Sequence, residues 1–208
     1  MAQAMKMDIM FRFIFGLSDV STHIWCHKNT KLFIPLQRFL VVKITAVMMK
    51  LVFATGNVGK LREASEILGE GFELVSLAQV GITEDIPETG KTLVANSLQK
   101  AMYLYDKVGC NCFADDTGLE VDALGGAPGV YTARYAGDDK DFNRNMDKVL
   151  YELEVLEGEA RMAESLGLKT KKVSRRARFK SVITLIVNGE RKIFEGTLEG
   201  VIAREKSG

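Results

Sequence analysis

The hydrophobic pattern of the chain changes near residue 49. Residues 1–48 show no sustained period of 3.6 or 2, and Pro35 interrupts their most apolar part. From Lys50 onward, short apolar runs are followed by segments whose apolar residues recur at helical spacing. We therefore expect an unassigned N-terminal extension, residues 1–48, followed by one folded domain over residues 49–208.

The first part of this domain is predicted to alternate strands and helices. Leu51–Ala54 is a short apolar run typical of a buried strand, and a second such run covers Phe72–Leu77. Two segments have helical periodicity: the one that begins near Leu61 and stops at Gly69, and the one from about Thr92 to Val108. An acidic loop, residues 84–90, precedes the second helix.

The second part is predicted to contain fewer regular elements. Cys112–Ala114 is interpreted as a strand closed by an Asp-Asp-Thr-Gly turn at residues 115–118, and residues 119–124 alternate like an edge strand. Residues 125–137 form a glycine-rich arm, and residues 157–177 are expected to be a charged, solvated loop. Asn188-Gly189 is a strong hairpin signal between two strand-like runs.

Composition excludes several classes of protein. The chain has 208 residues, of which 47% are hydrophobic and 26% charged, so it is neither disordered nor fibrous. With 28 Lys and Arg against 27 Asp and Glu, electrostatic binding of nucleic acid is not expected as its main task. No run is long enough for a membrane span. Three cysteines without a paired framework fit a reducing compartment, so we expect a cytoplasmic protein.

The N-terminal extension differs in charge from the rest of the chain. Residues 1–48 contain six Lys and Arg but two Asp and Glu. Arg12 divides the apolar run that a signal peptide would need, so we interpret the segment as an upstream extension, with Met48 or Met49 as the natural start. The His23–His27 stretch holds two histidines and Cys26, which is too incomplete a set for a zinc site.

A loop with the chemistry of a phosphate site follows the first strand. It reads Thr55-Gly56-Asn57-Val58-Gly59-Lys60 and leads into the first helix. Glycines let backbone N–H groups converge on an anion, the N-terminus of a helix is partially positive, and Lys60 adds a full charge. The loop lacks the pattern of a Walker A motif, and an ordinary strand-to-helix turn with an exposed lysine remains the alternative.

Acidic and basic side chains elsewhere in the domain would complement such a loop. Asp115 and Asp116 are adjacent carboxylates that repel each other unless a cation or donors compensate, and Mg²⁺ is the usual cation. Glu88, in the acidic loop, is a plausible third carboxylate. Asn96 and Lys100 share one helix face, for which a solvated surface is the alternative. Arg134, in the glycine-rich arm, could bind phosphate in bidentate fashion or form a surface ion pair.

Taken in order, these motifs resemble the inosine/xanthosine triphosphate pyrophosphatase family. The resemblance covers residues 49–208, about three quarters of the chain. It rests on five segments, of which Ala114–Leu119 and the Gly-Pro-Gly arm are the most specific: Thr55–Lys60, Glu88–Thr92, Asn96–Ala101, Ala114–Leu119 and Gly126–Tyr135. The related Maf type of pyrophosphatase is a weaker alternative because its signature differs.

The resemblance implies a fold and an activity. The fold would be an elongated α/β structure with a long mixed sheet and two lobes around a nucleotide cleft. The activity would be Mg²⁺-dependent hydrolysis of non-standard purine nucleoside triphosphates (ITP, dITP and XTP) to the monophosphate and pyrophosphate, by an enzyme that is usually a homodimer.

The resemblance also implies roles for individual residues. The loop from Thr55 to Lys60 would hold the triphosphate, Asn96 and Lys100 would line its phosphate end, and Arg134 is a further candidate contact. Thr117 would touch the substrate. Glu88 and Asp116 would bind Mg²⁺, with Asp115 as a further candidate ligand, and Asp116 would also act as the base on the attacking water.

The sequence departs from the family pattern after the late hairpin. The family continues with segments that carry purine recognition and part of the dimer packing, and these do not occur before Gly208. We therefore expect residues 49–208 to form a domain that is incomplete at its C-terminus. The alternative to an active enzyme is a truncated, non-catalytic relative that at most binds polyphosphate or nucleotide.

Overall fold

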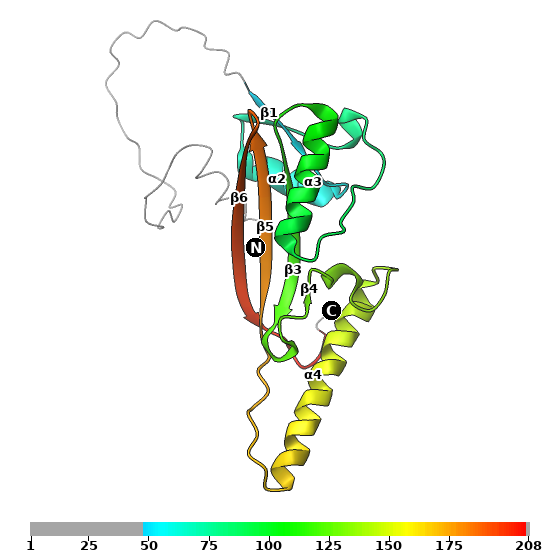
Figure 1. Cartoon of the computed structure of the whole chain (residues 1–208), viewed down its shortest axis with the longest axis vertical. Helices are drawn as coiled ribbons and strands as arrows, with labels where there is room; N and C mark the ends of the chain where they lie inside the picture. Colours follow the sequence, from blue (N-terminus) through cyan, green and yellow to red (C-terminus); the bar gives the residue numbers. More distant parts are fainter. Residues whose placement is uncertain (1–47, 207–208) are drawn as a thin grey trace, which may run out of the picture.

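The protein is built around a long mixed β-sheet. The computed structural model describes residues 48–206, which form a six-stranded sheet in the order β2–β1–β3–β5–β6, with β4 paired to β3 (Figure 1). β1 is parallel to β2 and β3, whereas β5 runs antiparallel to β3 and to β6, and β4 antiparallel to β3. The strands are β1 (Met49–Phe53), β2 (Phe72–Val75), β3 (Cys112–Val121), β4 (Pro128–Gly129), β5 (Arg176–Val187) and β6 (Glu190–Val201). The expected mixed α/β sheet is confirmed.

The helices divide the elongated molecule into two lobes. The described residues contain the α-helices α2 (Val58–Leu68), α3 (Leu93–Val108) and α4 (Phe142–Ser165). Figure 1 shows α2, α3, β1 and β2 at one end and α4 and β4 toward the other, while β3, β5 and β6 run through both. Three short 3-10 helices complete the elements: η1 (Ala78–Val80), η2 (Asp122–Leu124) and η3 (Thr132–Arg134). Within residues 48–206, no helix has the length and apolarity to span a membrane.

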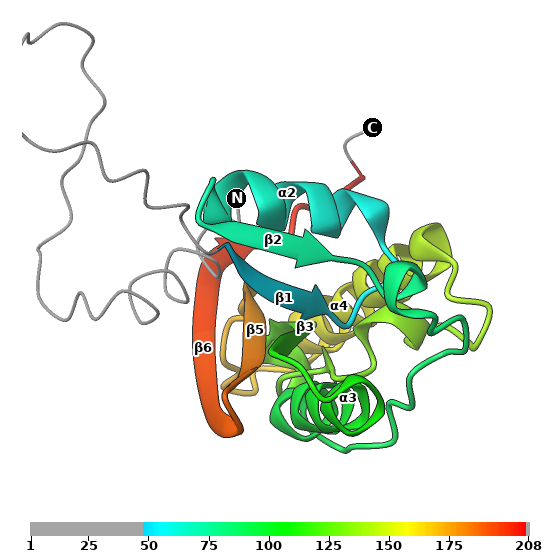
Figure 2. The same cartoon turned by 90° about the horizontal axis from the view of Figure 1, so that it is seen from above.

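The lobe that contains α2, α3, β1 and β2 (the upper lobe) has a core on each face of the sheet. This follows because successive residues of a strand point to opposite faces. Leu51 and Phe53 of β1 join Phe113 of β3 in a core covered by α2, where the two phenylalanine rings stack with centroids 4.2 Å apart. Val52 of β1 and Ala114 of β3 pack in a second core against α3. Figure 2 shows α2 and α3 on opposite sides of the sheet.

The turn predicted at residues 115–118 is wrong, because β3 continues without a break from Cys112 to Val121. All ten of its residues pair with β5, so the late hairpin supplies the hydrogen bonds that turn an apparent strand end into a strand centre. Gly118 serves a close approach instead of a turn, since a Cβ there would lie 2.3 Å from the Gly129 carbonyl oxygen on β4. This places Asp115 and Asp116 in the middle of the sheet.

The glycine-rich arm is held from both sides, although the sequence suggested an irregular segment. On the sheet side, the Leu119 N–H donates to Thr132 Oγ1, which itself donates to the Gly129 carbonyl. On the helix side, Asn145 of α4 accepts from the Ala136 N–H at 2.6 Å and donates to the Ala133 carbonyl at 2.9 Å. These bonds fix the part of the arm that carries Arg134.

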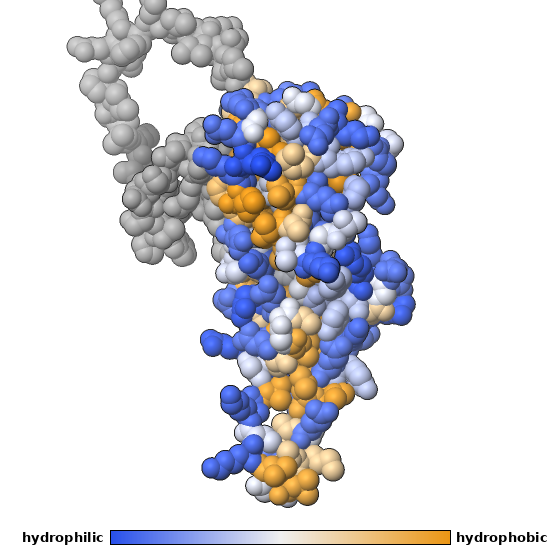
Figure 3. Space-filling view, viewed as in Figure 1, coloured by the Kyte–Doolittle hydropathy of each residue, from blue (hydrophilic) through white to orange (hydrophobic). Residues whose placement is uncertain are grey.

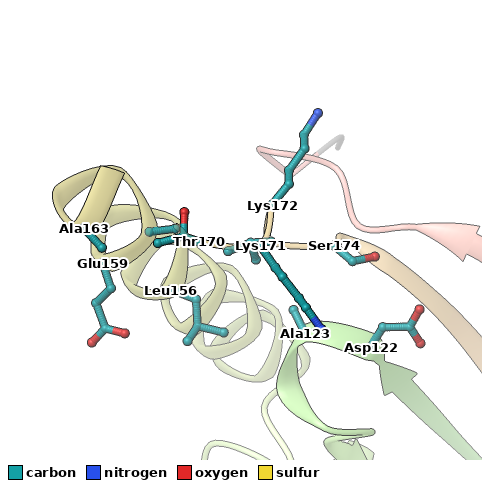
Figure 4. Close-up of a pocket in the computed structure, with 11 residues that line it drawn as sticks. Asp122, Ala123, Leu156, Glu159, Ala163, Thr170, Lys171, Lys172 and Ser174 are labelled. Atoms are coloured by element: carbon teal, nitrogen blue, oxygen red, sulfur yellow. The ribbon is translucent and has the colours of Figure 1, made fainter. Parts of the chain in front are cut away.

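The charged segment 157–177 is also more ordered than expected. The helix α4 extends to Ser165, nine residues into this segment. In the preceding turns Val149, Leu153 and Leu156 repeat at helical spacing and pack toward β3 and η2. Residues 170–174 then line a cavity of about 530 Å³, where Lys171 reaches toward Asp122 and Lys172 points outward (Figure 4). Figure 3 shows an apolar patch at this end of the molecule, where Leu166 and Leu168 are exposed.

The hairpin predicted at Asn188-Gly189 is confirmed. β5 and β6 pair over their full lengths and are joined by Asn188 and Gly189, both with positive φ (51° and 81°). Glu157 of α4 ties the far end of this hairpin to the helix: it accepts from Arg175 Nε at 2.7 Å and from Arg204 Nη1 at 3.1 Å.

The contact of Glu157 with Arg175 and Arg204 is expected to weaken in acid. The Arg175 hydrogen bond, with help from Arg204, lowers the pKa of Glu157 to about 2 from 4.5. A lowered folded-state pKa stabilises the fold above the unfolded-state value and is lost as pH falls toward 2. The urea unfolding midpoint of the wild type should fall between pH 5 and pH 2. We expect this fall to be smaller in Glu157→Gln and unchanged in Glu159→Gln, whose position is exposed. Identical profiles for wild type and Glu157→Gln would contradict this role.

Candidate active site

A cleft of about 900 Å³ opens between the two lobes and contains most of the predicted site residues. The upper lobe contributes the loop after β1, residues 82–88 and Lys100 of α3, and the arm contributes Arg134. The predicted residues that line it are Thr55, Gly56, Asn57, Val58, Lys60, Glu88, Lys100, Asp115 and Arg134. The expectation of a cleft that both lobes line is therefore confirmed.

The loop after β1 is organised by its own polar side chains. Thr55 Oγ1 accepts from the Asn57 N–H at 3.1 Å, and Asn57 caps α2 by accepting from the Lys60 N–H at 3.1 Å. The first turn of α2 contains no acidic residue that would cancel its positive end. Gly59 lies within this first turn, and Val58 is 79% exposed at the start of the helix. The loop therefore presents a helix N-terminus to the cleft.

Lys60 is paired across the cleft floor with Asp115 of β3. Its Nζ lies 2.7 Å from Asp115 Oδ2, and the Asp115 residue is 4% exposed. The pair explains how one of the two adjacent aspartates is tolerated in the sheet, since a buried carboxylate needs a cation or hydrogen-bond donors. It also keeps the Lys60 ammonium beside the loop.

Glu88, Lys100 and Asp116 form a second charged group. Lys100 Nζ lies 2.5 Å from Glu88 Oε1, and the Lys100 residue is buried. Burial raises the pKa of Asp116; the Lys100 ammonium and the Asn96 amide act against this rise, while Glu88 adds to it. Asn96 is buried too and accepts from the Gly90 N–H at 2.7 Å. The solvated helix face that the sequence left open as an alternative is therefore wrong.

Strand alternation separates the two aspartates. Asp115 follows Phe113 onto the α2 face, where it meets Lys60, whereas Asp116 follows Ala114 onto the α3 face, where it meets Lys100 and Asn96. In the part of the chain that the structure describes, no three His, Cys, Asp or Glu side chains converge enough to hold a metal. Glu88, Asp115 and Asp116 therefore do not form the three-carboxylate cluster that their sequence roles would suggest.

The remaining pair still fits a hard divalent cation. Asp116 Oδ2 is buried, and within residues 48–206 it has no hydrogen-bond partner, which is costly unless something binds there. Glu88 supplies a second carboxylate to the same group. Mg²⁺ is commonly held by one or two carboxylates together with substrate phosphates and water, so this donor set suits it.

The structure also places three further residues, of which Arg134 and Thr117 were predicted site residues and Lys140 was not. Arg134 lies over the Tyr131 ring, its guanidinium carbon 5.3 Å from the ring centroid, and lines the cleft. Thr117 bonds Ser181 Oγ at 2.8 Å and lines a neighbouring apolar groove of about 710 Å³ instead. Lys140, which sequence reasoning missed, lines both the cleft and this groove. Its φ of 54° had no signal in the sequence, because lysine rarely adopts this conformation.

Comparison with known proteins places this cleft in a family. The model of the Ham1 family matches residues 51–208, which include the whole cleft. The chain belongs to the Ham1 family. The resemblance drawn from the five sequence segments is thus confirmed at the level of the family.

Relatives and solved structures of the Ham1 family agree in extent. The chain is 46% identical to a dITP/XTP pyrophosphatase of Christiangramia forsetii over 160 residues, which cover 77% of this chain and 76% of that protein. It is 42% identical to the dITP/XTP pyrophosphatase of Bacillus subtilis, covering 78% and 76%. The structure of a HAM1 protein from Coxiella burnetii superposes with a TM-score of 0.66 at 34% identity, covering 77% and 76%.

Substitution of Gly56 tests whether the cleft loop of this Ham1 protein binds phosphate through its backbone. A Cβ there would meet no protein atom within 4 Å, so the fold itself does not require glycine. If the loop binds phosphate through its backbone, a methyl group would obstruct the anion. The loss of one charge-assisted hydrogen bond lowers the affinity for the anion about tenfold. We expect Gly56→Ala to raise the KM for a nucleoside triphosphate about tenfold at an unchanged melting temperature.

Gly71→Ala is the matched control, because a Cβ at Gly71 also meets nothing within 4 Å and Gly71 lies outside the cleft. It should change neither the KM nor the melting temperature. A wild-type KM in Gly56→Ala would contradict backbone binding of phosphate by this loop.

Proposed function

We propose that the protein hydrolyses the non-standard purine nucleoside triphosphates ITP, dITP and XTP to the monophosphate and pyrophosphate. This reaction would remove deaminated nucleotides from the precursor pool. The observation that carries the proposal is one cleft lined both by a helix N-terminal loop suited to polyphosphate and by Glu88 and Lys100, which also act on the neighbouring Asp116 carboxyl. The dITP/XTP pyrophosphatase names of the relatives support the same activity.

The phosphate end of the substrate would lie along the loop from Thr55 to Lys60. The N-terminus of α2 and the Lys60 ammonium favour a negative charge there, and Arg134 adds a planar donor from the other lobe. Lys60 would exchange part of its contact with Asp115 for a phosphate oxygen. Asn96 would act mainly through Gly90, which it holds beside Glu88.

Asp116 is the proposed base. Its buried Oδ2 has no partner among the described residues, and the raised pKa makes the ionised carboxylate a better proton acceptor than an exposed aspartate. The water that attacks the α-phosphorus would donate its proton to the Asp116 carboxylate. Lys100, beside both carboxylates, would orient them during the reaction.

Glu88 and Asp116 would hold Mg²⁺, with Asp115 as a more distant candidate that Lys60 already neutralises. Bound Mg²⁺ supplies positive charge against the phosphate oxygens. Glu88 contacts Lys100 through Oε1, so a metal bound at its other oxygen would share the carboxylate with the lysine and weaken that ion pair; the two cations compete for one negative charge. Thr117, on the groove side of β3, would contact the nucleoside part of the substrate.

Substrate selectivity tests this proposal. Steady-state pyrophosphate release from dITP, XTP, dGTP and dATP with Mg²⁺ should give the higher kcat/KM for dITP and XTP. Nucleotide binding without hydrolysis of any of the four would favour the non-catalytic alternative. Equal rates with all four would retain a pyrophosphatase but reject a preference for deaminated bases.

The remaining parts of the proposal concern organisation. The first strand starts at Met49 and the family match at residue 51, which supports a catalytic domain over residues 49–208. Apart from Met48, the extension, including His23–His27, lies outside the described residues. A homodimer follows from the family resemblance and can be measured by light scattering. Free thiols at Cys110 and Cys112 fit the proposed cytoplasmic location.

A further inference from the structure

The acidic loop that carries Glu88 is fastened to one face of α3. Residues 83–90 contain no helix or strand, so no backbone ladder of their own fixes them. Side chains of α3 replace that ladder at positions three and four residues apart, which lie on one helix face. These positions are Asn96, Gln99, Lys100, Tyr103 and Lys107.

The contacts follow the loop along the helix. Tyr103 OH and Lys107 Nζ both bond Glu84 Oε1, at 2.8 and 3.1 Å. Gln99 Oε1 accepts from the Thr89 N–H at 2.9 Å, and Gln99 Nε2 lies 3.0 Å from Thr89 Oγ1. Gln99 therefore holds Thr89 through both its backbone and its side chain, and Thr89 directly follows Glu88.

We propose that Gln99 is a positioning residue for Glu88, and that it sets the affinity of the Glu88–Asp116 pair for a divalent cation. This inference rests on the proposed function. Gln99 does not line the cleft and its amide touches neither carboxylate, so it acts through Thr89.

The need for such a residue follows from the competition for Glu88. While the carboxylate bonds Lys100, that ion pair holds Glu88 itself close to α3, between the contacts that Glu84 and Gly90 make with the same helix. When Glu88 turns to a cation, this restraint weakens, and the backbone must be held by another contact. Gln99 supplies it through Thr89 and so reduces the conformational freedom that metal binding would otherwise have to remove. Partners that orient a metal ligand typically contribute 10–100-fold to metal affinity.

The test is a titration of the full chain, free of nucleotide, with Mn²⁺ followed by electron paramagnetic resonance. We expect Gln99→Leu, which keeps the size of the side chain but removes its polar atoms, to raise the Kd for Mn²⁺ about tenfold. Gln99→Glu keeps an oxygen that accepts from the Thr89 N–H and should bind Mn²⁺ more tightly than Gln99→Leu. In turnover, Gln99→Leu should need about ten times more Mg²⁺ for half-maximal rate but reach a kcat close to wild type.

Gln79 offers a matched control. Its Oε1 likewise accepts from a backbone N–H and a hydroxyl of one loop residue, at 2.8 and 3.0 Å, but that residue is Ser76 and not the neighbour of Glu88. Gln79→Leu should leave the Kd for Mn²⁺ unchanged. An unchanged Kd in Gln99→Leu, or an equal rise in Gln79→Leu, would overturn the positioning role while wild-type activity stands.

The wild-type chain separates this inference from the function beneath it. If wild type neither binds Mn²⁺ nor releases pyrophosphate, the proposed function fails and the role of Gln99 fails with it. If wild type does both and Gln99→Leu equals it in Kd and in Mg²⁺ requirement, only the role of Gln99 is overturned.

Discussion

Asp116→Asn is expected to abolish pyrophosphate release while the protein remains folded. The substitution keeps the shape of the side chain and removes the negative charge at the buried Oδ2, which has no partner among residues 48–206. Loss of a base and of one metal ligand should lower kcat by about a thousandfold or more. The measurement is the steady-state rate with dITP and Mg²⁺, beside the far-ultraviolet circular dichroism of the variant.

The same variant predicts a change in stability with a definite sign. Burial is the main cause that raises the pKa of Asp116 above its ordinary 3.8. A raised carboxyl pKa means that stability is full at pH values below 3.8 and is lost as pH rises through the folded-state pKa. Asp116→Asn should therefore melt at or above the wild-type temperature at pH 7, and the difference should vanish at acidic pH.

The exposed Asp106 of α3 provides the control for this experiment. Asp106→Asn should retain wild-type turnover and the wild-type dependence of stability on pH. Near-normal turnover in Asp116→Asn would reject Asp116 as the base. A lower melting temperature at pH 7 would instead show that its ionised form stabilises the fold.

Lys100→Met is expected to give the largest loss of stability. Lys100 is buried and is the cation beside both Glu88 and Asp116. Breaking a buried pair by removal of one partner leaves an uncompensated charge and costs about 3 kcal/mol. The loss should be largest at neutral and alkaline pH and small below the ordinary carboxyl pKa, because the pKa of Asp116 rises further in the variant. Urea unfolding at several pH values measures it.

Added Mg²⁺ should restore part of the stability of Lys100→Met, since a bound cation replaces the missing ammonium. Lys107→Met is the control: Lys107 is on the same helix, and its pair with Glu84 is about half-exposed on both sides, so its loss should destabilise the fold much less. Equal destabilisation by the two substitutions would show that the Glu88–Lys100–Asp116 group is not a special feature of the fold.

The elements that sequence periodicity predicted best are those with local signals. The first strand and helix, the helix α3 and the Asn188-Gly189 hairpin all occur close to their predicted positions. Each has a cap or a turn that depends on neighbours in sequence, such as Asn57 before α2 and Thr92 before α3. By contrast, the length of β3 depends on β5, sixty residues further along, and was missed. The helix α4 was missed because frequent charges hid its apolar stripe.

The candidate site shows the same difference between features with local sequence signals and features that depend on distant residues. The sequence was sufficient to select the residues that line the cleft, because their chemistry is local: glycines, lysines and carboxylates next to predicted strands and helices. It could not predict which of them pair. Lys60 meets Asp115 and Lys100 lies beside Asp116 because strand alternation sends the two aspartates to opposite faces, with α2 on one and α3 on the other. Lys100 meets Glu88 because the acidic loop folds along α3. Gln99 carried no signal at all, since its partner Thr89 is found only after the loop folds back.

The products formed from dITP test the central claim most directly. The full chain would be incubated with dITP and Mg²⁺, and the products separated by ion exchange and identified by phosphorus-31 magnetic resonance. Cleavage between the α and β phosphates predicts dIMP and pyrophosphate in equal amounts, with neither dIDP nor orthophosphate. Release of orthophosphate with dIDP, or no hydrolysis by a chain that still folds, would contradict the proposed pyrophosphatase.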